Sequence, residues 1–229
     1  MVERGEDLGR GSWSGCDYIL KTWLSFYRGG VIIMLKMRID FKSLIQKKPN
    51  KINDDFLVCL ITGTQGSGKS YFAIYHNENF ETDKTIYTNI KSYKSKKHKV
   101  IYFDKIEEIY TNNATHCIFI IDELSKKYTK DSRQDKAFYS WLQQSRKHNR
   151  YVYLITQEYL QVPTWLRGVA DKVYTTTKLP FGLCKTSLGF PVLDKETMEW
   201  GIDTIGFVIY KRTKKITELY NTFEFVDDL

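Results

Sequence analysis

The sequence predicts an α/β fold: a mostly parallel sheet flanked by helices, with an antiparallel hairpin at its C-terminal edge. The first observation is that short runs rich in Val, Ile, Tyr and Phe alternate with polar or helix-compatible segments, as a parallel sheet requires. These runs are FLVCLIT (56–62), TIYTN (85–89), KVIYF (99–103), CIFIID (117–122), YVYLITQ (151–157) and DKVYTTT (171–177). The second is the closing stretch GFVIYKRTKKITELYNTF (206–223), which indicates two strands joined by a basic turn.

A phosphate-binding loop is predicted where the first run gives way to a helix-compatible segment. The sequence GTQGSGKS there fits the pattern G-x-x-x-x-G-K-[ST]. Backbone N–H groups at a helix start attract anions, and glycines let the backbone approach them closely. The nucleotide-contacting residues are expected to be Gly63, Thr64, Gln65, Gly66, Ser67, Gly68, Lys69, Ser70 and Tyr71. A glycine-rich connector without a ligand is the alternative, but the flanking strand and helix favour a P-loop NTPase.

Within this loop, Lys69 is predicted to supply positive charge to the β and γ phosphates of ATP. The Ser70 hydroxyl is placed to ligate Mg²⁺. A second motif, CIFIIDE, puts Asp122 and Glu123 at the end of a central strand, where open α/β sheets bind ligands. We expect Asp122 to hold Mg²⁺ and Glu123 to act as general base toward the attacking water. Surface acids that merely follow a strand are the alternative.

A third element is WLQQSRKHNRYVYLITQ, in which a helix carrying Gln143, Gln144, Arg146, Lys147 and His148 is expected to lead into a buried strand. That strand, Tyr151 to Thr156, ends at Gln157. An uncharged amide there could sense the γ-phosphate or orient water without repelling phosphate, and so couple hydrolysis to movement. The alternative is a glutamine that begins an ordinary loop.

Composition limits the cellular context. The 229 residues carry 35 Lys and Arg against 27 Asp and Glu, a net charge of +8, which suits nucleic acid or an anionic membrane face. Cys16, Cys59, Cys117 and Cys184 show no C-x-x-C spacing, so a reducing cytoplasm is expected. No apolar run approaches the length of a membrane-spanning helix, and no secretory signal is evident.

The domain organisation is predicted to change near residue 54. Residues 1–53 form an N-terminal extension in which DYILKTWLSFY places Ile19, Leu20, Trp23, Leu24 and Tyr27 at helical spacing. Such an amphipathic helix could pack on its own domain or dock on a capsid or membrane partner. The segment KKPNKIN then indicates a linker, and residues 54–229 form the P-loop ATPase domain.

The motifs GTQGSGKS, IYTNI, IIDE, SRKHNR and LITQ, followed by VPTWLRGVADKVY, resemble the FtsK-HerA group of P-loop ATPases. Within it they resemble zonula occludens toxin-type (Zot) phage proteins and viral genome-packaging ATPases. The resemblance covers about residues 56–225. It implies Gly63, Gly66, Gly68, Lys69 and Ser70 on phosphate and Mg²⁺, Asp122 and Glu123 as the Walker B pair, and Gln157 as sensor.

The resemblance also implies a homo-oligomeric ring, most often a hexamer, that moves DNA through a central pore. An arginine of one subunit then reaches the neighbour's nucleotide. Arg146 is the first candidate and Arg150 the second, although RKHNRY departs from the Arg-His-Gly of many relatives.

Three functions compete. The first is a DNA-translocating genome-packaging ATPase in the host cytoplasm, associated with the virion at a packaging vertex. The second is a Zot-type filamentous phage assembly or secretion ATPase, disfavoured because such proteins usually continue into a membrane span. The third is a nucleotide-dependent binding module. The basic segments Lys91–Lys99, with Tyr93 among the lysines, and Lys126–Lys136 favour the first by predicting sequence-independent DNA binding, and solvated loops are the alternative for each.

Overall fold

The computed structural model describes residues 22–28, 31–37, 58–79, 84–111 and 113–221. Its contacts divide the chain into two units, Met1–Lys47 and Lys48–Leu229. The sequence places this boundary six residues later, after Asn53. The predicted linker falls within residues that the structure does not describe.

The first unit contains a two-stranded antiparallel hairpin of β1 (Thr22–Arg28) and β2 (Val31–Met37). The helix expected in this region is therefore wrong over 22–27, while residues 17–21 of that prediction lie outside the described part. Arg28 pairs with Val31, so only Gly29 and Gly30 separate the strands, a sequence typical of two-residue hairpin connections. Pairing with the β-branched run after the glycines outweighs the helical spacing of the first segment.

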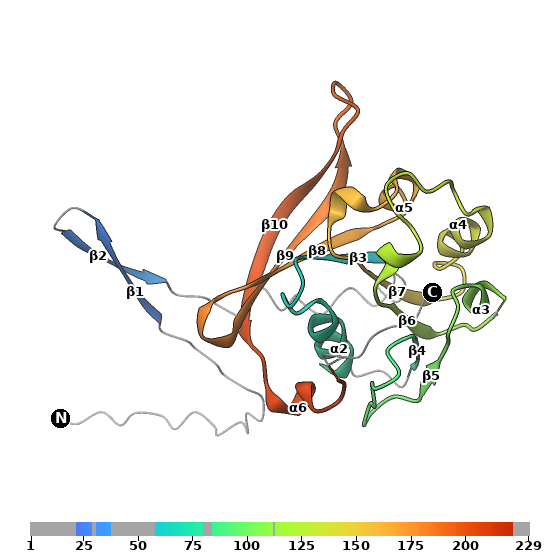
Figure 1. Cartoon of the computed structure of the whole chain (residues 1–229), viewed down its shortest axis with the longest axis horizontal. Helices are drawn as coiled ribbons and strands as arrows, with labels where there is room; N and C mark the ends of the chain where they lie inside the picture. The colour runs from blue at the N-terminus through green and yellow to red at the C-terminus, as the bar shows by residue number, and fades with distance from the viewer. Residues whose placement is uncertain (1–21, 29–30, 38–57, 80–83, 112, 222–229) are drawn as a thin grey trace, which may run out of the picture. The chain divides into compact units, whose positions relative to one another are not determined.

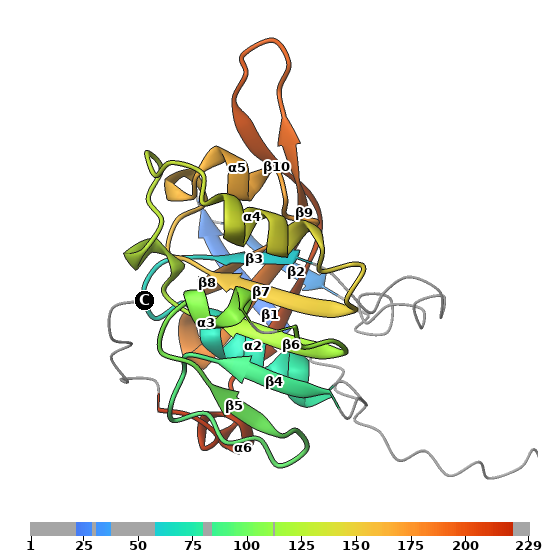
Figure 2. The ribbon, with the colours of Figure 1, turned by 90° about the vertical axis from the view of Figure 1, so that its right-hand side faces the viewer.

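The second unit is built on one eight-stranded sheet of order β10-β9-β8-β3-β7-β6-β4-β5 (Figures 1 and 2). Six adjacent strands, β8 through β5 in that order, are parallel, and β9 and β10 are antiparallel additions at one edge. This confirms the predicted fold class. The strands are β3 (Val58–Thr62), β4 (Thr85–Thr88), β5 (Val100–Tyr102), β6 (Cys117–Ile121), β7 (Arg150–Ile155), β8 (Lys172–Lys178), β9 (Leu183–Leu193) and β10 (Trp200–Lys211).

Helices cover both faces of this sheet, so strand residues on both faces are buried. In β3, Val58 and Leu60 belong to one core cluster with residues of α3, α4 and α5, whereas Cys59 and Ile61 belong to a second cluster with residues of α2 and α6. The helices are α2 (Lys69–Asn79), α3 (Glu107–Tyr110), α4 (Lys136–Gln143), α5 (Thr164–Arg167) and α6 (Lys214–Thr217), with 3-10 turns at Leu124–Lys126, Tyr159–Gln161 and Pro180–Gly182. In the described ranges, no helix has the length and apolar character needed to cross a membrane.

The C-terminal hairpin exists, but its strands differ from the prediction. The stretch GFVIYK completes β10, whose partner is β9, and the residues expected to form the second strand begin with helix α6. Strand β9 is difficult to predict from the sequence because it contains Gly189 and Pro191, and both residue types are unfavourable in strand interiors. Pro191 is tolerated because the pairing of β9 with β8 ends at Gly189.

Three cysteines, Cys59, Cys117 and Cys184, are free and buried. Cys59 and Cys117 lie in β3 and β6, so the prediction of buried strand thiols is confirmed for both. Burial raises the pKa of Cys59 to about 12 and that of Cys117 to about 11. Both side chains therefore behave as small apolar groups. Cys16 lies outside the described residues.

Candidate functional site

The loop between β3 and α2 has positive φ at all three of its glycines, and at two of them a Cβ would also lie too close to neighbouring atoms. Gly63 has φ +146°, and a Cβ there would lie 2.3 Å from the Thr176 carbonyl oxygen. Gly68 has φ +101°, and a Cβ there would lie 2.9 Å from Nη2 of Arg212. Phe72 N donates to Gly68 O at 2.8 Å, so the helix starts directly from the last glycine. The strand, glycine loop and helix start predicted from the sequence are all present.

Side chains of neighbouring strands hold the loop in place. Ser67 is fully buried, and its Oγ lies 2.7 Å from Thr176 Oγ1, which in turn donates to Thr62 O at 3.1 Å. Thr64, Gln65 and Gly66 are exposed at the loop tip. The structure thus places the predicted residues from Gly63 to Gly68 in one loop fastened to β8, while Lys69, Ser70 and Tyr71 begin α2. The Tyr71 side chain is fully buried, and the binding roles of the other residues stay predictions.

The Lys69 side chain extends back over the loop and bonds its carbonyl oxygens. Its Nζ donates to Gly63 O at 2.9 Å and to Thr64 O at 3.2 Å. Burial lowers the pKa of Lys69 from its ordinary value, and the nearby carboxylates of Asp122 and Glu123 oppose that shift. An anion bound in the loop would favour the charged amine in the same way as these carboxylates do.

Ser70 and Asp122 meet although they come from different motifs. Ser70 Oγ donates to Asp122 Oδ2 at 2.5 Å. Burial raises the pKa of Asp122, and hydrogen bonds from the Ser70 hydroxyl and the Glu123 backbone N–H oppose that rise. A hydroxyl beside a desolvated carboxylate is a pair of oxygen donors of the kind that Mg²⁺ prefers. The two residues predicted to hold the metal are therefore brought together and fit that ion.

Asn89 is a residue of this site that the sequence reasoning missed. It directly follows β4, and its side chain pairs with the backbone of Asp122 in both directions: Nδ2 donates to Asp122 O at 2.9 Å, and Oδ1 accepts from Asp122 N at 2.8 Å. Asn89 is 3% exposed. It fixes the backbone from which the Asp122 carboxylate projects. The signal available in the sequence was a polar residue at the end of the strand TIYTN.

Glu123 adopts a left-handed backbone with φ 54° and ψ 41°. Its N–H donates to Asp122 Oδ1 at 2.8 Å, and its carboxylate pairs with Lys126 Nζ at 3.1 Å. A positive φ is uncommon for a non-glycine residue and clusters at functional sites. The two carboxylates have different partners, Ser70 for Asp122 and Lys126 for Glu123, which is compatible with different roles for the two acids.

Gln157 lies beside the start of the phosphate-binding loop. Its carbonyl oxygen accepts from Gly63 N at 3.0 Å, and its side chain is exposed. A displacement of Gln157 would therefore act directly on the first glycine of the loop. This contact supports a coupling role, while sensing of phosphate by the amide stays a prediction.

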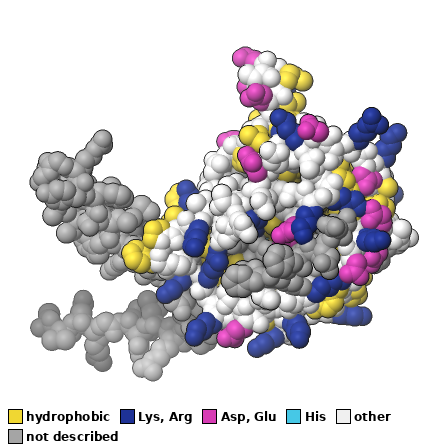
Figure 3. Space-filling view, in the orientation of Figure 1, with side chains coloured by type: hydrophobic (Ala, Val, Ile, Leu, Met, Phe, Trp, Pro, Cys, Tyr) yellow, Lys and Arg dark blue, Asp and Glu magenta, His cyan; other side chains and the backbone are white. Residues whose placement is uncertain are grey.

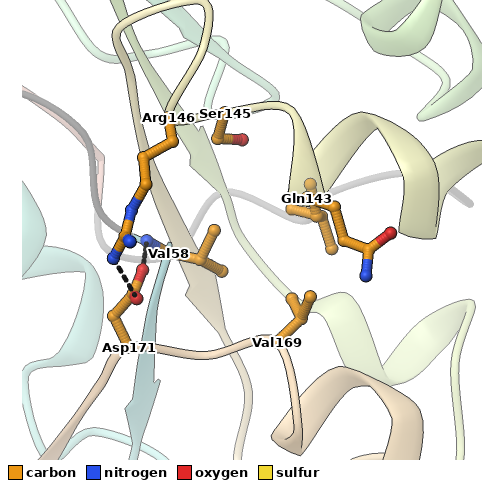
Figure 4. Close-up of a pocket in the computed structure, with 7 residues that line it drawn as sticks. Val58, Gln143, Ser145, Arg146, Val169 and Asp171 are labelled. Atoms are coloured by element: carbon orange, nitrogen blue, oxygen red, sulfur yellow. Dashed lines mark hydrogen bonds and ion pairs between the residues drawn. The ribbon is translucent and has the colours of Figure 1, made fainter.

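Arg146 lies at the opposite end of the parallel strands, beside the start of β3. The helix expected to carry it ends earlier, at Gln143, so Arg146, Lys147 and His148 follow in a turn rather than on a helix. Arg146 Nη2 lies 3.4 Å from Asp171 Oδ1, and Asp171 Oδ2 accepts from Val58 N at 2.9 Å (Figure 4). Val58 begins β3, whereas the loop follows its other end, about 15 Å away along the strand.

A pocket of about 310 Å³ surrounds this ion pair, and it is lined by Val58, Leu142, Gln143, Ser145, Arg146, Val169 and Asp171. Arg146 thus lies away from the phosphate-binding loop of its own chain, and its action on a neighbour stays a prediction. Arg150 is unsuited to that role. It is 1% exposed, donates from Nε to Ala114 O at 2.8 Å, and its guanidinium lies over the Trp141 ring.

A family model and several solved structures match this chain. The family model described as Zonular occludens toxin (Zot) matches residues 57–223. The N-terminal domain of zonular occludens toxin from Neisseria meningitidis is similar, with a TM-score of 0.51 and 22% identity over 72% of this chain and 99% of that chain. At this identity the likeness shows a shared fold.

Two further structures match at lower TM-scores. The genome packaging NTPase B204 from Sulfolobus turreted icosahedral virus 2, in complex with ATP-gammaS, has a TM-score of 0.45 and 16% identity over 65% of this chain and 97% of that chain. The RadB recombinase has a TM-score of 0.46 and 14% identity over 69% and 87% of the two chains. No curated protein matches the sequence.

Proposed function

The chain belongs to the zonular occludens toxin (Zot) family, and from this premise we propose that it is a magnesium-dependent ATPase that couples ATP hydrolysis to the movement of phage or viral DNA into a capsid. The observation that carries the proposal is the 2.5 Å contact between Ser70 of the phosphate-binding loop and Asp122 of the acidic pair. It joins the two halves that phosphoryl transfer requires, a phosphate cradle and a carboxylate pair.

Each part of the site has a separate task in this proposal. The loop N–H groups and Lys69 bind the phosphates of ATP. Ser70 and Asp122 would hold Mg²⁺, which neutralises phosphate charge when bound. Glu123 takes the proton of the attacking water, a step worth about 10²- to 10⁴-fold in rate. Asn89 positions Asp122 through its paired hydrogen bonds.

Movement of the loop would reach other strands through Gln157. Its carbonyl holds Gly63 N, so a change at the γ-phosphate that displaces Gln157 also displaces the start of the loop. Gln157 is the predicted γ-phosphate sensor, and it follows β7 next to β3 in the sheet. This arrangement supports a direct mechanical link from hydrolysis to the sheet.

DNA binding independent of sequence is part of the proposal. Lys94, Lys96, Lys97 and Lys99 are exposed on the loop between β4 and β5. In the second basic segment, Lys126 and Lys127 pair with Glu123 and Glu107, while Lys130, Arg133 and Lys136 are exposed. Figure 3 shows Lys and Arg side chains spread over one face, with acidic side chains among them. Phosphate contacts of this kind bind DNA without reading bases.

Base stacking on Tyr93 is excluded from this proposal. The Tyr93 side chain is fully buried, and its hydroxyl donates to Glu78 Oε1 at 2.9 Å. The aromatic residue that the sequence placed among the DNA-contacting lysines is therefore part of the core. Lysine contacts to phosphate remain as the proposed mode of binding.

A homo-oligomeric ring, with a hexamer as the proposed size, would complete the site. Arg146 is exposed at the end of the strands away from its own loop, a position from which it could face a neighbouring subunit. In the same proposal the N-terminal extension docks on a capsid or membrane partner. The proposed location is the host cytoplasm, with attachment to the virion at a packaging vertex.

A second candidate function is the Zot-type assembly or secretion ATPase of filamentous phages, and the family match favours it. It would use the same hydrolytic site. Co-sedimentation of the chain with capsids would support packaging, whereas co-sedimentation with host membranes would support the assembly ATPase. A nucleotide-dependent binding module, the third candidate, requires ATP binding without appreciable turnover.

DNA-stimulated ATP hydrolysis tests the proposal. The chain should hydrolyse ATP faster with DNA of any sequence, while Glu123→Gln should retain ATP binding and lose turnover about 10²- to 10⁴-fold. The matched control is Glu218→Gln, which removes an exposed carboxylate and should leave turnover unchanged. Turnover unaffected by DNA would refute the coupling, and normal turnover in Glu123→Gln would require a different base.

A further inference from the structure

Arg212 reaches the phosphate-binding loop from a strand at the far edge of the sheet. It follows β10 directly, and its Nη2 donates to Gly66 O at 2.6 Å. A Cβ built at Gly68 would lie 2.9 Å from the same nitrogen, so the guanidinium packs against the loop at two glycines. The sequence gives no local sign of this contact, because 146 positions separate Arg212 from Gly66.

The chain on both sides of Arg212 is fastened to the first turn of α2. Tyr210 stacks on Tyr71 with ring centroids 5.9 Å apart and an interplanar angle of 10°. Thr213 N donates to the Tyr71 hydroxyl at 3.0 Å. Arg212 Nε also lies 3.2 Å from the sulfur of buried Cys184. The guanidinium is therefore held in place before any ligand binds, which reduces the entropy lost on binding.

Two of the five N–H donors of the Arg212 guanidinium make these bonds, and three remain. A guanidinium is the side chain best matched to phosphate oxygens, because its planar fork can bind two of them. Strand order indicates which phosphates it meets. Asp122 and Glu123 follow β6, on one side of β3, while Arg212 approaches from β10 on the other side. In the proposed function the γ-phosphate lies on the side of Asp122 and Glu123. Arg212 approaches the loop from the opposite side and therefore faces the α- and β-phosphates.

We propose that Arg212 binds the α- or β-phosphate of the nucleotide held in the loop of its own chain. It is a positioning residue that adds a second cation beside Lys69. This inference rests on the proposed function, since it requires that the loop bind a nucleotide. Because ATP and ADP share both phosphates, Arg212 contributes equally to the binding of each. Its loss therefore raises KM more than it lowers kcat.

The test compares nucleotide affinities of full-length variants by calorimetric titration with MgADP and with a non-hydrolysable Mg-ATP analogue. Arg212→Ala should weaken both about 10- to 100-fold, the effect of one charge-assisted hydrogen bond. Arg212→Lys should recover part of the affinity. Lys211→Ala, which removes the adjacent exposed cation, should stay within about twofold.

Arg212→Gln separates phosphate binding from a purely structural contact. Its side chain is polar and can donate hydrogen bonds, but it lacks the charge. It should therefore weaken ADP binding as Arg212→Ala does and flatten the dependence of that affinity on salt. This variant also serves if Arg212→Ala fails to fold. Wild-type affinity or an unchanged salt slope in Arg212→Gln would overturn the proposal.

Lys69→Ala distinguishes this inference from the proposed function. If Lys69→Ala loses nucleotide binding while the Arg212 variants bind normally, the Arg212 proposal alone is wrong. If Lys69→Ala and the Arg212 variants all bind as the parent does, the nucleotide site itself is wrongly assigned. A loss confined to the ATP analogue would contradict assignment to the α- or β-phosphate.

Discussion

Replacing Asn89 by alanine should destabilise the protein and disturb the acidic half of the site together. The substitution removes both hydrogen bonds to the Asp122 backbone, at 2.9 and 2.8 Å, from a side chain that is 3% exposed. It leaves one partly buried N–H and one C=O without this partner, at about 1–3 kcal/mol each. We expect the free energy of unfolding to fall by about 2–6 kcal/mol. For a domain of this size that lowers Tm by roughly 10 °C.

Urea unfolding followed by circular dichroism measures this loss. ATP turnover of Asn89→Ala, measured well below its Tm, should fall about tenfold or more because the Asp122 carboxylate is no longer held in register. Asn79→Ala is the matched control. It also removes an asparagine bond to a backbone oxygen, Tyr75 O at 2.7 Å, but at an exposed position, so the change should stay within about 0.5 kcal/mol. Equal losses in the two variants would refute the reasoning.

Three further predictions concern pH, DNA and the neighbouring subunit. Burial, with a contribution from Lys172, lowers the pKa of His76 from 6.5 to about 4, so between these values the unfolded chain binds more protons than the folded chain. The free energy of unfolding should therefore fall by about 2 kcal/mol from pH 7 to pH 5, and a slope that persists in His76→Gln would place the titration elsewhere. Replacing Lys94, Lys96, Lys97 and Lys99 by Gln should weaken DNA binding uniformly across sequences and reduce its salt slope by up to about 0.9 for each lost phosphate contact, whereas an equal slope would remove this loop from the DNA path. Arg146→Ala should bind ATP normally but hydrolyse it about 10³-fold more slowly, and subunits mixed with Lys69→Ala should regain activity; no recovery in verified mixed rings would exclude action across the interface.

The central motifs could be predicted because their residues are close in sequence. The loop Gly63–Ser70 and the pair Asp122–Glu123 each follow an apolar strand, so one short window contains both the strand and the polar residues at its end. Ser70 and Asp122 then meet because β7 pairs in parallel with both β3 and β6, a strand order that the motifs alone do not give. The fold class followed from the same alternation of strands and helices.

Residues placed by distant pairing could not be found in this way. Arg212 reaches the loop only because β10 pairs with β9, and β9 carries a glycine and a proline that conceal it in the sequence. Arg150 belongs to the stretch SRKHNR, whose composition indicates an exposed basic turn. Its guanidinium is nevertheless buried, over the Trp141 ring and bonded to Ala114 O. Tyr93 also lies in a basic stretch, yet its side chain is buried and its hydroxyl donates to Glu78 on the distant helix α2. In each case tertiary contacts outweigh local polarity.

The hairpin of β1 and β2 differs from the predicted helix for a related reason. The helical spacing within residues 17–27 concerns one segment alone, whereas β1 is formed with a second segment beyond Gly29 and Gly30. Every cross-strand pair stabilises a hairpin, and the spacing of apolar residues within one segment does not show this stabilisation. The two glycines between β-rich runs were the available signal.

ATP hydrolysis by Lys69→Ala, measured beside the parent chain as phosphate release at saturating MgATP, tests the central claim most directly. Lys69 is the motif's cation, and its Nζ lies on the loop carbonyls of Gly63 and Thr64. Its loss should reduce turnover to background while circular dichroism shows the fold intact, because the β and γ phosphates lose that charge. Turnover equal to the parent's would contradict the assignment of this loop as the catalytic phosphate site.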